Sequence, residues 1–375
     1  MTQQYRPAWV EVDLGAIRAN VAALAEAARP ARLMAVVKAG AYGHGAVPVA
    51  RAALDASATW LGVALVEEGI ELRDAGIRAP ILVLSEPPIA AAAAVVAHDL
   101  TPFVYTASGI EALAKAVVAG ERGRPRSVHL KVDTGMHRVG CTPADAVALA
   151  TSVGEHDELV LGGVATHLAV ADQRDNPETG AQLDRFDGVI ADLDAAGLRP
   201  PLAHAANSAG MLGHPRAHYD LVRPGIAIYG TAPVGWLADR VSLRPALSLR
   251  ARVTFVKELP AGSGVSYGLT YSLSKAGRIA TVPLGYADGV PRALGSSGGE
   301  VLINGTRLPI AGRVTMDQFM VDAGDASVEP GDEVVLVGRQ GEDEIPATEV
   351  AGRVGTIAYE IIAGLGSRVP RTYRQ

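Results

Sequence analysis

A lysine at the end of an apolar segment is the first residue of this sequence that could carry covalent chemistry. Lys38 follows the run Leu33–Val37 and precedes the glycine-rich turn Ala39-Gly40-Ala41-Tyr42-Gly43-His44-Gly45. Apolar surroundings lower the pKa of a lysine and yield the neutral amine that Schiff-base chemistry needs. A structural lysine whose ammonium reaches water from the end of a strand fits this position equally well. The glycines decide little, because their spacing does not match the dinucleotide-binding fingerprint.

Lysine is scarce in this chain, which raises the interest of each one that remains. Of the 34 basic residues, five are lysine: Lys38, Lys115, Lys131, Lys257 and Lys275. Arginine does not lose its proton and cannot act as an amine nucleophile. Where lysine persists, its amine chemistry is therefore a candidate reason.

Short apolar segments alternate with helical patterns over the first two-thirds of the chain. The expected strands are Leu33–Lys38, Trp60–Leu65, Ile81–Leu84, Pro102–Tyr105, Val128–Asp133, Val160–His167, Leu202–Ala205 and Tyr219–Arg223. Continuous apolar runs of this kind are typical of strands buried on both faces. Eight strands alternating with helices predict an α/β fold, a (β/α)8 TIM barrel, whose active site lies at the carboxyl ends of the strands. A doubly wound open sheet is the alternative.

Helix ends can be recognised at two places in this part of the chain. Thr142-Pro143 followed by Asp145 predicts an N-cap with proline in the first turn. The apolar spacing from Leu183 to Leu193 predicts a helix that Gly197 closes in the left-handed conformation.

The pattern changes near residue 240, where strands follow one another without long helices between them. The expected strands are Leu247–Lys257, Arg278–Pro283, Glu300–Ile310, Phe319–Asp322 and Glu333–Val337. Asn304-Gly305 is a strong hairpin signal within the third of them, and one helix is expected over Thr348–Leu365, ended by Gly364 or Gly366. The chain is therefore divided into a barrel, residues 1–240, and a mainly β C-terminal domain, residues 241–375.

Composition excludes several classes of protein. The net charge of −6 without long runs of one sign argues against a dedicated partner of nucleic acid or of anionic membranes. The single cysteine, Cys141, fits a reducing compartment. The first fifteen residues lack the layout of a signal peptide, and the longest apolar stretch, Ile89–Ala97, is too short to span a bilayer. We expect a cytoplasmic protein.

A serine-hydrolase motif has to be weighed against the lysine chemistry. Gly264-Val265-Ser266-Tyr267-Gly268 fits the nucleophile-elbow pattern, which requires a following helix and a histidine later in the chain. The last histidine is His218, and no helical pattern follows Ser266. The hydrolase interpretation therefore fails.

The segment around Lys38 resembles the cofactor-lysine signature of bacterial alanine racemases, which are pyridoxal-phosphate enzymes of fold type III. Further blocks match in the same order along essentially the whole chain: Asp133–Gly140, His204–Ser208, Val222–Ile226, Gly264–Gly268, Gly285–Gly289, Met316–Gln318 and Ala358–Glu360. Each block is modest by itself, but together they are highly specific. The resemblance implies a barrel followed by a β domain, as the pattern predicts independently.

The resemblance implies a two-base mechanism on the external aldimine of pyridoxal phosphate. Lys38 would hold the cofactor and act as one base, and Tyr267 would be the other, on the opposite face. Racemisation needs both, because one base removes the Cα proton and the other returns it. A tyrosine phenol ordinarily has a pKa of about 10 and needs help as a base. The family supplies a histidine, which matches His167; a structural core histidine is the alternative.

The remaining cofactor contacts are also implied by the resemblance. Arg223 matches an arginine that faces the pyridine nitrogen. Since guanidinium keeps its proton, that nitrogen would stay unprotonated and the ring would be a weak electron sink, which restricts side reactions such as transamination. A structural ion pair is the alternative. The phosphate contacts would come from Tyr42, Asn207, Ser208, Tyr359 and the backbone N–H groups of Gly225 and Ile226. Capping of a helix is the alternative for Asn207 and Ser208.

Other matched positions concern the substrate and a second subunit. Arg138 matches an arginine that contacts the substrate carboxylate, and Lys131 matches a lysine that is carbamylated in several members. A carbamate would be an anion able to hold Arg138, although an ordinary strand lysine is the alternative. Met316, Tyr286, Asp317 and Tyr267 match residues that the partner subunit supplies in an obligate homodimer. Asp172, Arg292, Arg313 and Ile357 match a substrate corridor. Thr315 departs from the cysteine of many members.

The function implied is interconversion of L-alanine and D-alanine, which supplies D-alanine for peptidoglycan. A racemase of broad or serine specificity is the nearest alternative. A non-catalytic pyridoxal-phosphate carrier on the same barrel lacks the β domain, and related decarboxylases place a carboxylate where Arg223 stands. His214 and His218 have helical spacing, but Pro215 intervenes and no further ligand is evident, so no metal site is expected.

Overall fold

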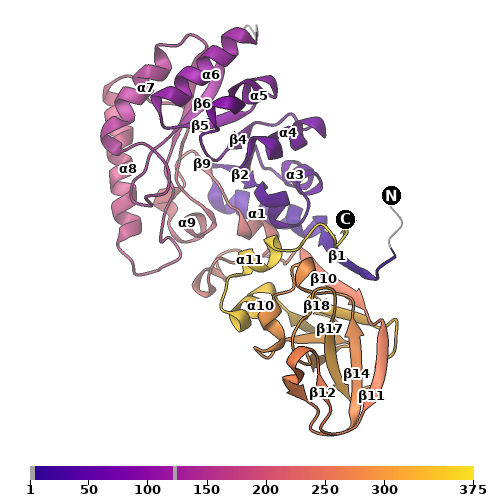
Figure 1. Cartoon of the computed structure of the whole chain (residues 1–375). Helices are drawn as coiled ribbons and strands as arrows, with labels where there is room; N and C mark the ends of the chain where they lie inside the picture. Colours follow the sequence, from indigo (N-terminus) through magenta and orange to yellow (C-terminus); the bar gives the residue numbers. More distant parts are fainter. Residues whose placement is uncertain (1–4, 121–124) are drawn as a thin grey trace. The chain divides into compact units, whose positions relative to one another are not determined.

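The computed structural model describes residues 5–120 and 125–375, which form two compact units. One unit comprises residues 16–41 and 46–244, and the other comprises residues up to 15, 42–45 and 245–375. The first contains the barrel, and the second is mainly β (Figure 1).

The barrel unit contains eight parallel strands in the order β8-β7-β6-β5-β4-β3-β2-β9, as predicted. They are β2 Arg32–Val36, β3 Trp60–Val63, β4 Ile81–Val83, β5 Thr101–Val104, β6 Arg126–Lys131, β7 Leu159–Ala165, β8 Ala203–His204 and β9 Leu221–Val222. The barrel closes between β8 and β9, where Asp220 N–H donates to Ala203 O at 3.0 Å and Arg223 N–H donates to Ala206 O at 2.9 Å. The open-sheet alternative is thereby excluded.

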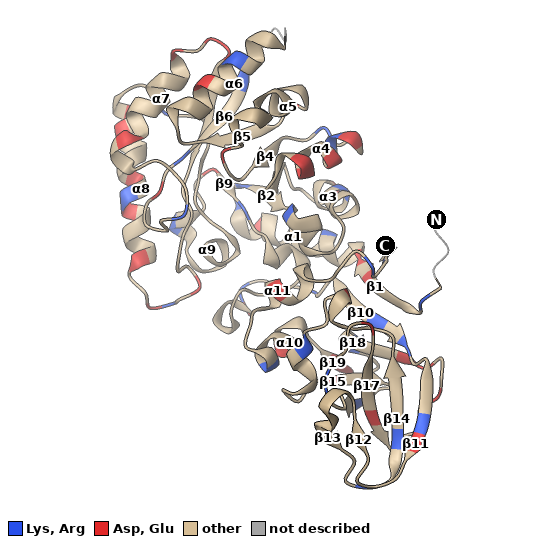
Figure 2. Ribbon diagram, viewed as in Figure 1, with Lys and Arg blue, Asp and Glu red and all other residues tan. Residues whose placement is uncertain are grey.

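Helices lie around these strands (Figure 1). They are α1 Leu14–Ala28, α3 Ala46–Asp55, α4 Val66–Asp74, α5 Ala92–Ala97, α6 Ala107–Ala119, α7 Ala146–Gly154, α8 Glu178–Ala195 and α9 Ser208–Gly213. Thr142 accepts a hydrogen bond from Asp145 N–H, and Gly197 has a φ of +69° beyond α8, so both expected helix ends are confirmed. The charged side chains of α8 are mostly acidic, with Arg185 as the one basic residue of that helix (Figure 2).

The interior of the barrel is filled by side chains, which leaves its carboxyl edge as the place for chemistry. Its core includes Met34, Trp60, Leu82, Phe103, Ala165, Leu202 and Leu221. Burial of such apolar side chains contributes roughly 1.5–3 kcal/mol each. The packed strands fix the positions of the residues that directly follow them.

The β unit contains three sheets. The largest has the order β16-β15-β18-β10-β1-β20, with β19 beside β18, while β11-β14-β17 and β12-β13 form the others. The strands are β1 Ala8–Asp13, β10 Leu247–Arg252, β11 Phe255–Leu259, β12 Gly264–Val265, β13 Tyr271–Ser272, β14 Gly277–Val282, β15 Glu300–Ile303, β16 Thr306–Pro309, β17 Phe319–Gly324, β18 Glu333–Gln340, β19 Asp343–Ile345 and β20 Arg371–Arg374. The hairpin at Asn304-Gly305 is confirmed, with φ values of +52° and +76°.

Three details of the β unit differ from the expectation. The segment expected as one strand, Leu247–Lys257, is split into β10 and β11, which belong to different sheets. The single helix expected over Thr348–Leu365 is two, α10 Ala347–Val354 and α11 Ala358–Ala363, because Gly355 adopts a φ of +75° between them. Strand β1 pairs with β10 and β20, so this part of residues 1–240 belongs to the β unit. No helix among the described residues is long and apolar enough to cross a membrane.

Candidate active site at the carboxyl ends of the barrel strands

Lys38 begins a turn with an unusual backbone. Ala39, Gly40 and Ala41 have φ/ψ values of 52/50°, 59/39° and 55/52°, so the chain makes a left-handed turn immediately after the lysine. The left-handed conformation costs alanine about 1–2 kcal/mol per residue. Ala41 N–H nevertheless donates to Val37 O at 2.9 Å, which holds the turn against the end of β2. Strained backbone of this kind concentrates at functional sites.

The charge of Lys38 is set by its surroundings. Burial lowers the pKa of Lys38, the Arg138 cation lowers it further, and the Glu68 carboxylate opposes both. Glu68 also anchors the turn, because its carboxylate accepts from Ala39 N–H at 2.5 Å and from Ala64 N–H at 2.7 Å. The ammonium group of Lys38 therefore loses its proton more readily than that of an exposed lysine.

Arg223 follows β9 and is only 4% exposed, yet among the residues that the structure describes no carboxylate accepts a hydrogen bond from it. Its guanidinium donates to His204 Nδ1 at 2.8 Å, to Thr166 O at 2.8 Å, to Ala205 O at 3.0 Å and to His167 Nδ1 at 3.3 Å. Burial lowers its pKa to about 9. The ion-pair alternative for Arg223 is therefore wrong: this cation is held by neutral acceptors.

His167 follows β7 and lies beside Arg223. Burial holds the pKa of His167 well below its usual range, and the Arg223, Lys131, Arg138 and Lys38 cations add to this effect. Because guanidinium can only donate, the Arg223 contact makes His167 Nδ1 an acceptor and places the ring proton on Nε2. His167 is thus a neutral imidazole with an Nε2–H donor.

Asn207 and Ser208 lie where α9 begins, and their side chains accept different hydrogen bonds. Asn207 is the N-cap, because its side chain accepts from Gly210 N–H at 2.9 Å. The Ser208 hydroxyl accepts from Gly225 N–H at 2.9 Å and from Ala227 N–H at 3.3 Å, which ties α9 to the segment after β9. Ser208 retains its own O–H as a donor, whereas the Gly225 N–H expected to face a phosphate is already used by Ser208.

Lys131 ends β6 and is almost fully buried beside cations. Its Nζ lies 3.4 Å from Val132 O. Burial holds the pKa of Lys131 well below its usual value, and Arg223 and Arg138 lower it further, while Asp133 opposes them. The loop that carries exposed Arg138 is shaped by Asp133 Oδ1, which accepts from Gly135, Met136 and His137 N–H groups at 3.0 Å each.

The β unit presents the residues expected at a partner's site on exposed loops. Tyr267 begins the 3-10 turn Tyr267–Leu269 and is 72% exposed, and Met316 is 52% exposed. Tyr286 N–H donates to Thr315 O at 3.0 Å, and Ala287 N–H donates to Met316 O at 3.1 Å. A hollow lined by Ser266, Tyr267, Gly268, Leu269, Thr315 and Met320 adjoins these loops. The side chain of Asp317 is paired with Arg368 at 2.7 Å.

Gly285 allows the loops of Tyr286 and Met316 to lie in contact. A Cβ on Gly285 would stand 2.2 Å from Met316 O and 2.4 Å from Thr315 O, both of which are backbone atoms. We expect Gly285→Ala to lower the free energy of unfolding by about 1–3 kcal/mol, measured by urea denaturation. Gly352→Ala, in open space on α10, is the matched control and should stabilise by roughly 0.5–1 kcal/mol. Equal stability of the two variants would contradict the close approach.

Tyr42 and Tyr359 lie side by side within the β unit, with ring centroids 6.1 Å apart. Burial raises the pKa of Tyr42 to about 12, so its phenol remains a hydrogen-bond donor at neutral pH. Arg371 holds the segment around Tyr42, because its Nε donates to Gly43 O at 3.0 Å while its other nitrogens donate to the carbonyls of Leu365, Gly366 and Val369.

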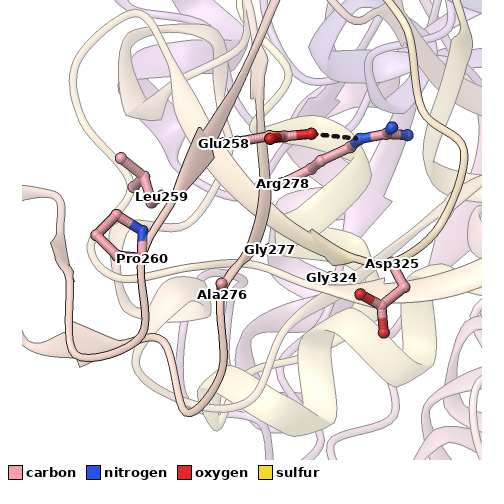
Figure 3. Close-up of a pocket in the computed structure, with 8 residues that line it drawn as sticks. All are labelled: Glu258, Leu259, Pro260, Ala276, Gly277, Arg278, Gly324 and Asp325. Carbon is pink, nitrogen blue, oxygen red and sulfur yellow. Dashed lines mark ion pairs between the residues drawn. The ribbon is translucent and has the colours of Figure 1, made fainter.

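Other hollows and histidines do not gather expected site residues. A pocket of about 490 Å³ at the ends of β11, β14 and β17 is lined by Glu258, Leu259, Pro260, Ala276, Gly277, Arg278, Gly324 and Asp325 (Figure 3). His214 and His218 contact the carbonyls of Ala171 and Met211. Within residues 5–120 and 125–375, no cluster of three or more His, Cys, Asp or Glu could hold a metal ion.

The corridor residues are distributed over both units, and nothing in the structure tests their role. Asp172 accepts from Trp236 Nε1 through its carbonyl at 2.9 Å, Arg313 O accepts from Ser266 Oγ at 2.6 Å, and Ile357 is exposed. Arg292 begins the 3-10 turn Arg292–Gly295. Their assignment stays a prediction.

Sequence reasoning missed Glu68, His204 and His129 as parts of this site. Glu68 lies in a helix rich in acidic residues and had no distinguishing signal. His204 falls within a matched block and is fully buried. His129 precedes Lys131 by two residues on β6, so both of these side chains lie on the same face of the strand. The alternation of a strand could have indicated His129 as a neighbour of Lys131.

Comparison with known proteins agrees with this architecture. Residues 12–233 match the family model of the alanine racemase N-terminal domain, and residues 246–373 match that of the alanine racemase C-terminal domain. An alanine racemase of Symbiobacterium thermophilum is 52% identical over 370 residues, which cover 98% of this chain and 97% of that protein. One of Thermobifida fusca is 46% identical, with 96% of each chain covered.

Solved structures lead to the same group. The alanine racemase of Streptomyces lavendulae superposes with a TM-score of 0.93 at 42% identity, covering 100% of this chain and 98% of that one. The Bacillus anthracis enzyme with bound L-Ala-P has a TM-score of 0.92 at 40% identity, covering 100% and 96%. These relatives and family models thus define the class of the protein, a pyridoxal-phosphate-dependent racemase. Within this class, the chain belongs to the alanine racemase family.

The residues at the barrel edge fit the cofactor that the family uses. Pyridoxal phosphate is an anionic aldehyde with a basic ring nitrogen. The edge offers an amine with a lowered pKa at Lys38 and a buried guanidinium without a carboxylate partner at Arg223. Its basic side chains are Lys38, Lys131, Arg138 and Arg223, and the two guanidinium groups among them keep the positive charge that suits an anionic ligand.

Proposed function

We propose that this chain interconverts L-alanine and D-alanine with pyridoxal phosphate held covalently by Lys38 Nζ. The observation that carries the proposal is Lys38 itself, an amine with a lowered pKa on a rigid left-handed turn at the carboxyl end of a barrel strand. When bound, the cofactor supplies an electron sink that acidifies the Cα–H bond of an amino acid. The protein residues then have to move one proton.

We assign the two proton-transfer roles to Lys38 and Tyr267. Inversion at Cα requires one group that takes the proton from one face and another that gives a proton to the opposite face. Lys38 serves one face through Nζ, and the Tyr267 hydroxyl of the partner subunit serves the other. His167, a neutral imidazole with an Nε2–H, is proposed to assist the phenol, and Arg138 to bind the substrate carboxylate.

The cofactor ring and phosphate are assigned to separate parts of the site. Arg223 is proposed to meet the ring nitrogen, and its neutral partners support this role because they leave its positive charge uncompensated. Ser208, Asn207 and Ile226, with the phenols of Tyr42 and Tyr359, are proposed to bind the phosphate. Gly225 is proposed to join them by exchanging its Ser208 acceptor for a phosphate oxygen. The free O–H of Ser208 and the persistently protonated Tyr42 support this assignment.

A homodimer is part of the proposal, because Tyr267, Tyr286, Met316 and Asp317 are assigned to the partner's site. Its support is the exposure of large apolar side chains on these loops. Tyr267 is 72% exposed, Leu269 68% and Met316 52%. Apolar groups gathered in this way are typical of surfaces that contact another protein.

The direct test is incubation of the purified, cofactor-loaded protein with L-alanine, followed by chiral chromatography. Formation of D-alanine until both enantiomers are equal is the expected result. Cofactor-loaded protein that forms no D-alanine would refute the proposal. The same assay with L-serine and other amino acids separates an alanine-specific enzyme from the broad-specificity alternative.

Carbamylation of Lys131 is proposed as well, and it gives a separate prediction. Burial favours the neutral amine of Lys131, which can attack CO2 and form a carbamate with release of one proton, so that a neutral group is replaced by an anion beside Arg138. In 13C-bicarbonate, the protein should show one carbamate resonance in its NMR spectrum. Lys131→Ala should remove it and raise the KM for alanine, since Arg138 loses its anionic partner.

Lys115→Ala is the matched control for this measurement. Lys115 is exposed and paired with Glu111 at 2.8 Å, so its replacement should leave the resonance intact. A resonance that survives in Lys131→Ala would contradict the assignment to Lys131.

A further inference from the structure

Two buried histidines extend the contacts of Arg223 into the interior of the barrel. His204 Nδ1 lies 2.8 Å from Arg223 Nη1, and His204 Nε2 lies 2.9 Å from His129 Nδ1. Both rings are completely buried. The row Arg223–His204–His129 thus runs from the candidate site into the core, and we call it the histidine row.

The direction of each hydrogen bond in the histidine row follows from the chemistry of guanidinium. Arg223 can only donate, so His204 Nδ1 must accept. A neutral imidazole has one N–H, which His204 then carries on Nε2 and donates to His129 Nδ1. His129 in turn carries its proton on Nε2. Both rings are neutral: burial lowers the pKa of His129 to about 3, and burial with the Arg223 cation holds that of His204 well below its usual range.

A glycine on the neighbouring strand leaves room for the His129 ring inside the barrel. Gly163 is the residue of β7 that pairs with His129 across the sheet, and a Cβ on it would stand 2.6 Å from His129 Nδ1 and 2.7 Å from Cε1. Glycine weakens a strand and marks a close approach of another group. The aromatic rings of Trp60 and Phe103 complete the surroundings, with Trp60 5.3 Å from His129 and Phe103 stacked on His204 at 5.9 Å.

The far end of the row shows what His129 contributes. His129 Nε2 is buried and has no hydrogen-bond partner among the described residues. A buried donor without a partner is costly, whereas an apolar side chain would fill the same place without that cost. Within the described part of the chain, the one hydrogen bond of the His129 side chain is acceptance of the His204 proton.

We propose that His129 is a positioning residue for Arg223: as the acceptor for His204 Nε2–H, it fixes the tautomer that leaves His204 Nδ1 free to accept from the guanidinium. This inference rests on the proposed role of Arg223 toward the cofactor ring. The histidine row holds the guanidinium with a neutral partner where a carboxylate would neutralise it. A ring nitrogen that meets this full cation stays unprotonated.

The first test observes the tautomers directly, without reference to activity. Side-chain 15N NMR of the histidine-labelled, cofactor-loaded protein should show neutral Nε2–H rings for both His129 and His204, assigned by their loss in single variants. A proton on His204 Nδ1, or a doubly protonated His204, would overturn the histidine row.

The second test separates the acceptor from the volume of the ring. Leucine at position 129 fills space but accepts nothing, whereas the side-chain oxygen of asparagine can take the place of Nδ1. His129→Leu should lower kcat by about 10–100-fold with little change in KM, as loss of a supporting hydrogen bond commonly does, and shift the absorption spectrum of the bound cofactor. His129→Asn should restore both kcat and the spectrum substantially. Equal behaviour of the two variants would overturn the proposal.

Phe103→Leu is the matched control for loss of packing. It removes an aromatic ring stacked on His204 but no hydrogen bond of the histidine row. It should lower the melting temperature while leaving the His204 tautomer and the cofactor spectrum unchanged. A changed tautomer would show that packing, and not the His129 acceptor, determines the tautomer of His204. Wild-type protein that forms no D-alanine but shows the expected tautomers would refute the proposed function alone.

Discussion

Replacing Lys38 with alanine is expected to abolish racemisation together with covalent attachment of pyridoxal phosphate. The variant loses both the amine that holds the cofactor and one of the two bases, so kcat should fall by at least about a thousandfold. Borohydride treatment followed by mass spectrometry should trap a cofactor adduct in the wild-type protein and none in Lys38→Ala. D-alanine formation is measured in parallel.

Two further variants make this result specific. Lys38→Arg keeps the positive charge but offers no amine, so it should fail as completely as Lys38→Ala. Lys115→Ala removes an exposed lysine of the same unit and should retain both the adduct and full activity. An adduct that persists in Lys38→Ala would place the cofactor on another lysine and refute the assignment.

Replacing Tyr267 with phenylalanine is expected to separate cofactor binding from inversion. The adduct at Lys38 should persist, whereas racemisation should fall by about a hundredfold or more, because one face of the substrate has lost its proton donor. The two directions should also differ in deuterium incorporation from heavy water, since only one face retains its base. Full racemase activity in Tyr267→Phe would refute the role of its hydroxyl.

Mixing the two inactive variants tests whether Tyr267 acts on the partner. A mixed dimer of Lys38→Ala and Tyr267→Phe subunits contains one site with both native bases and one site with neither. If subunits exchange randomly, an equal mixture should recover about a quarter of the wild-type activity. If Lys38 and Tyr267 act within one chain, the mixture would stay inactive, and the proposal that two subunits share each site would be wrong. The single variants mixed with themselves are the controls.

The eight barrel strands were predictable because most of them are short, largely buried apolar runs, and they are confirmed. Lys38, His167 and Arg223 could be placed at the carboxyl edge for the same reason, since each directly follows such a run. The resemblance then added roles that periodicity alone does not contain. Hydrogen-bond chemistry could not be predicted in this way: Arg223 looked like a candidate for an ion pair, but the structure surrounds it with neutral acceptors.

The details that escaped prediction depend on long-range partners or on unfavourable local conformations. Alanine disfavours the left-handed region, so Ala39 and Ala41 gave no signal for the turn that holds Lys38. Strand β1 alternates buried and half-buried residues, but its partners lie near residues 250 and 372. His129 resembled an ordinary core residue, because its partner His204 is 75 positions away.

The pairing of β1 has a consequence for how the chain is synthesised. The strand that leaves the ribosome early, Ala8–Asp13, has its two neighbours at Leu247–Arg252 and Arg371–Arg374. In chain order the barrel is therefore an insertion within the β unit, and β1 must remain without its neighbours while the barrel strands emerge. Pairing over such separations is slow, and β1 obtains its second neighbour only when β20, more than 350 residues later in the chain, has been synthesised.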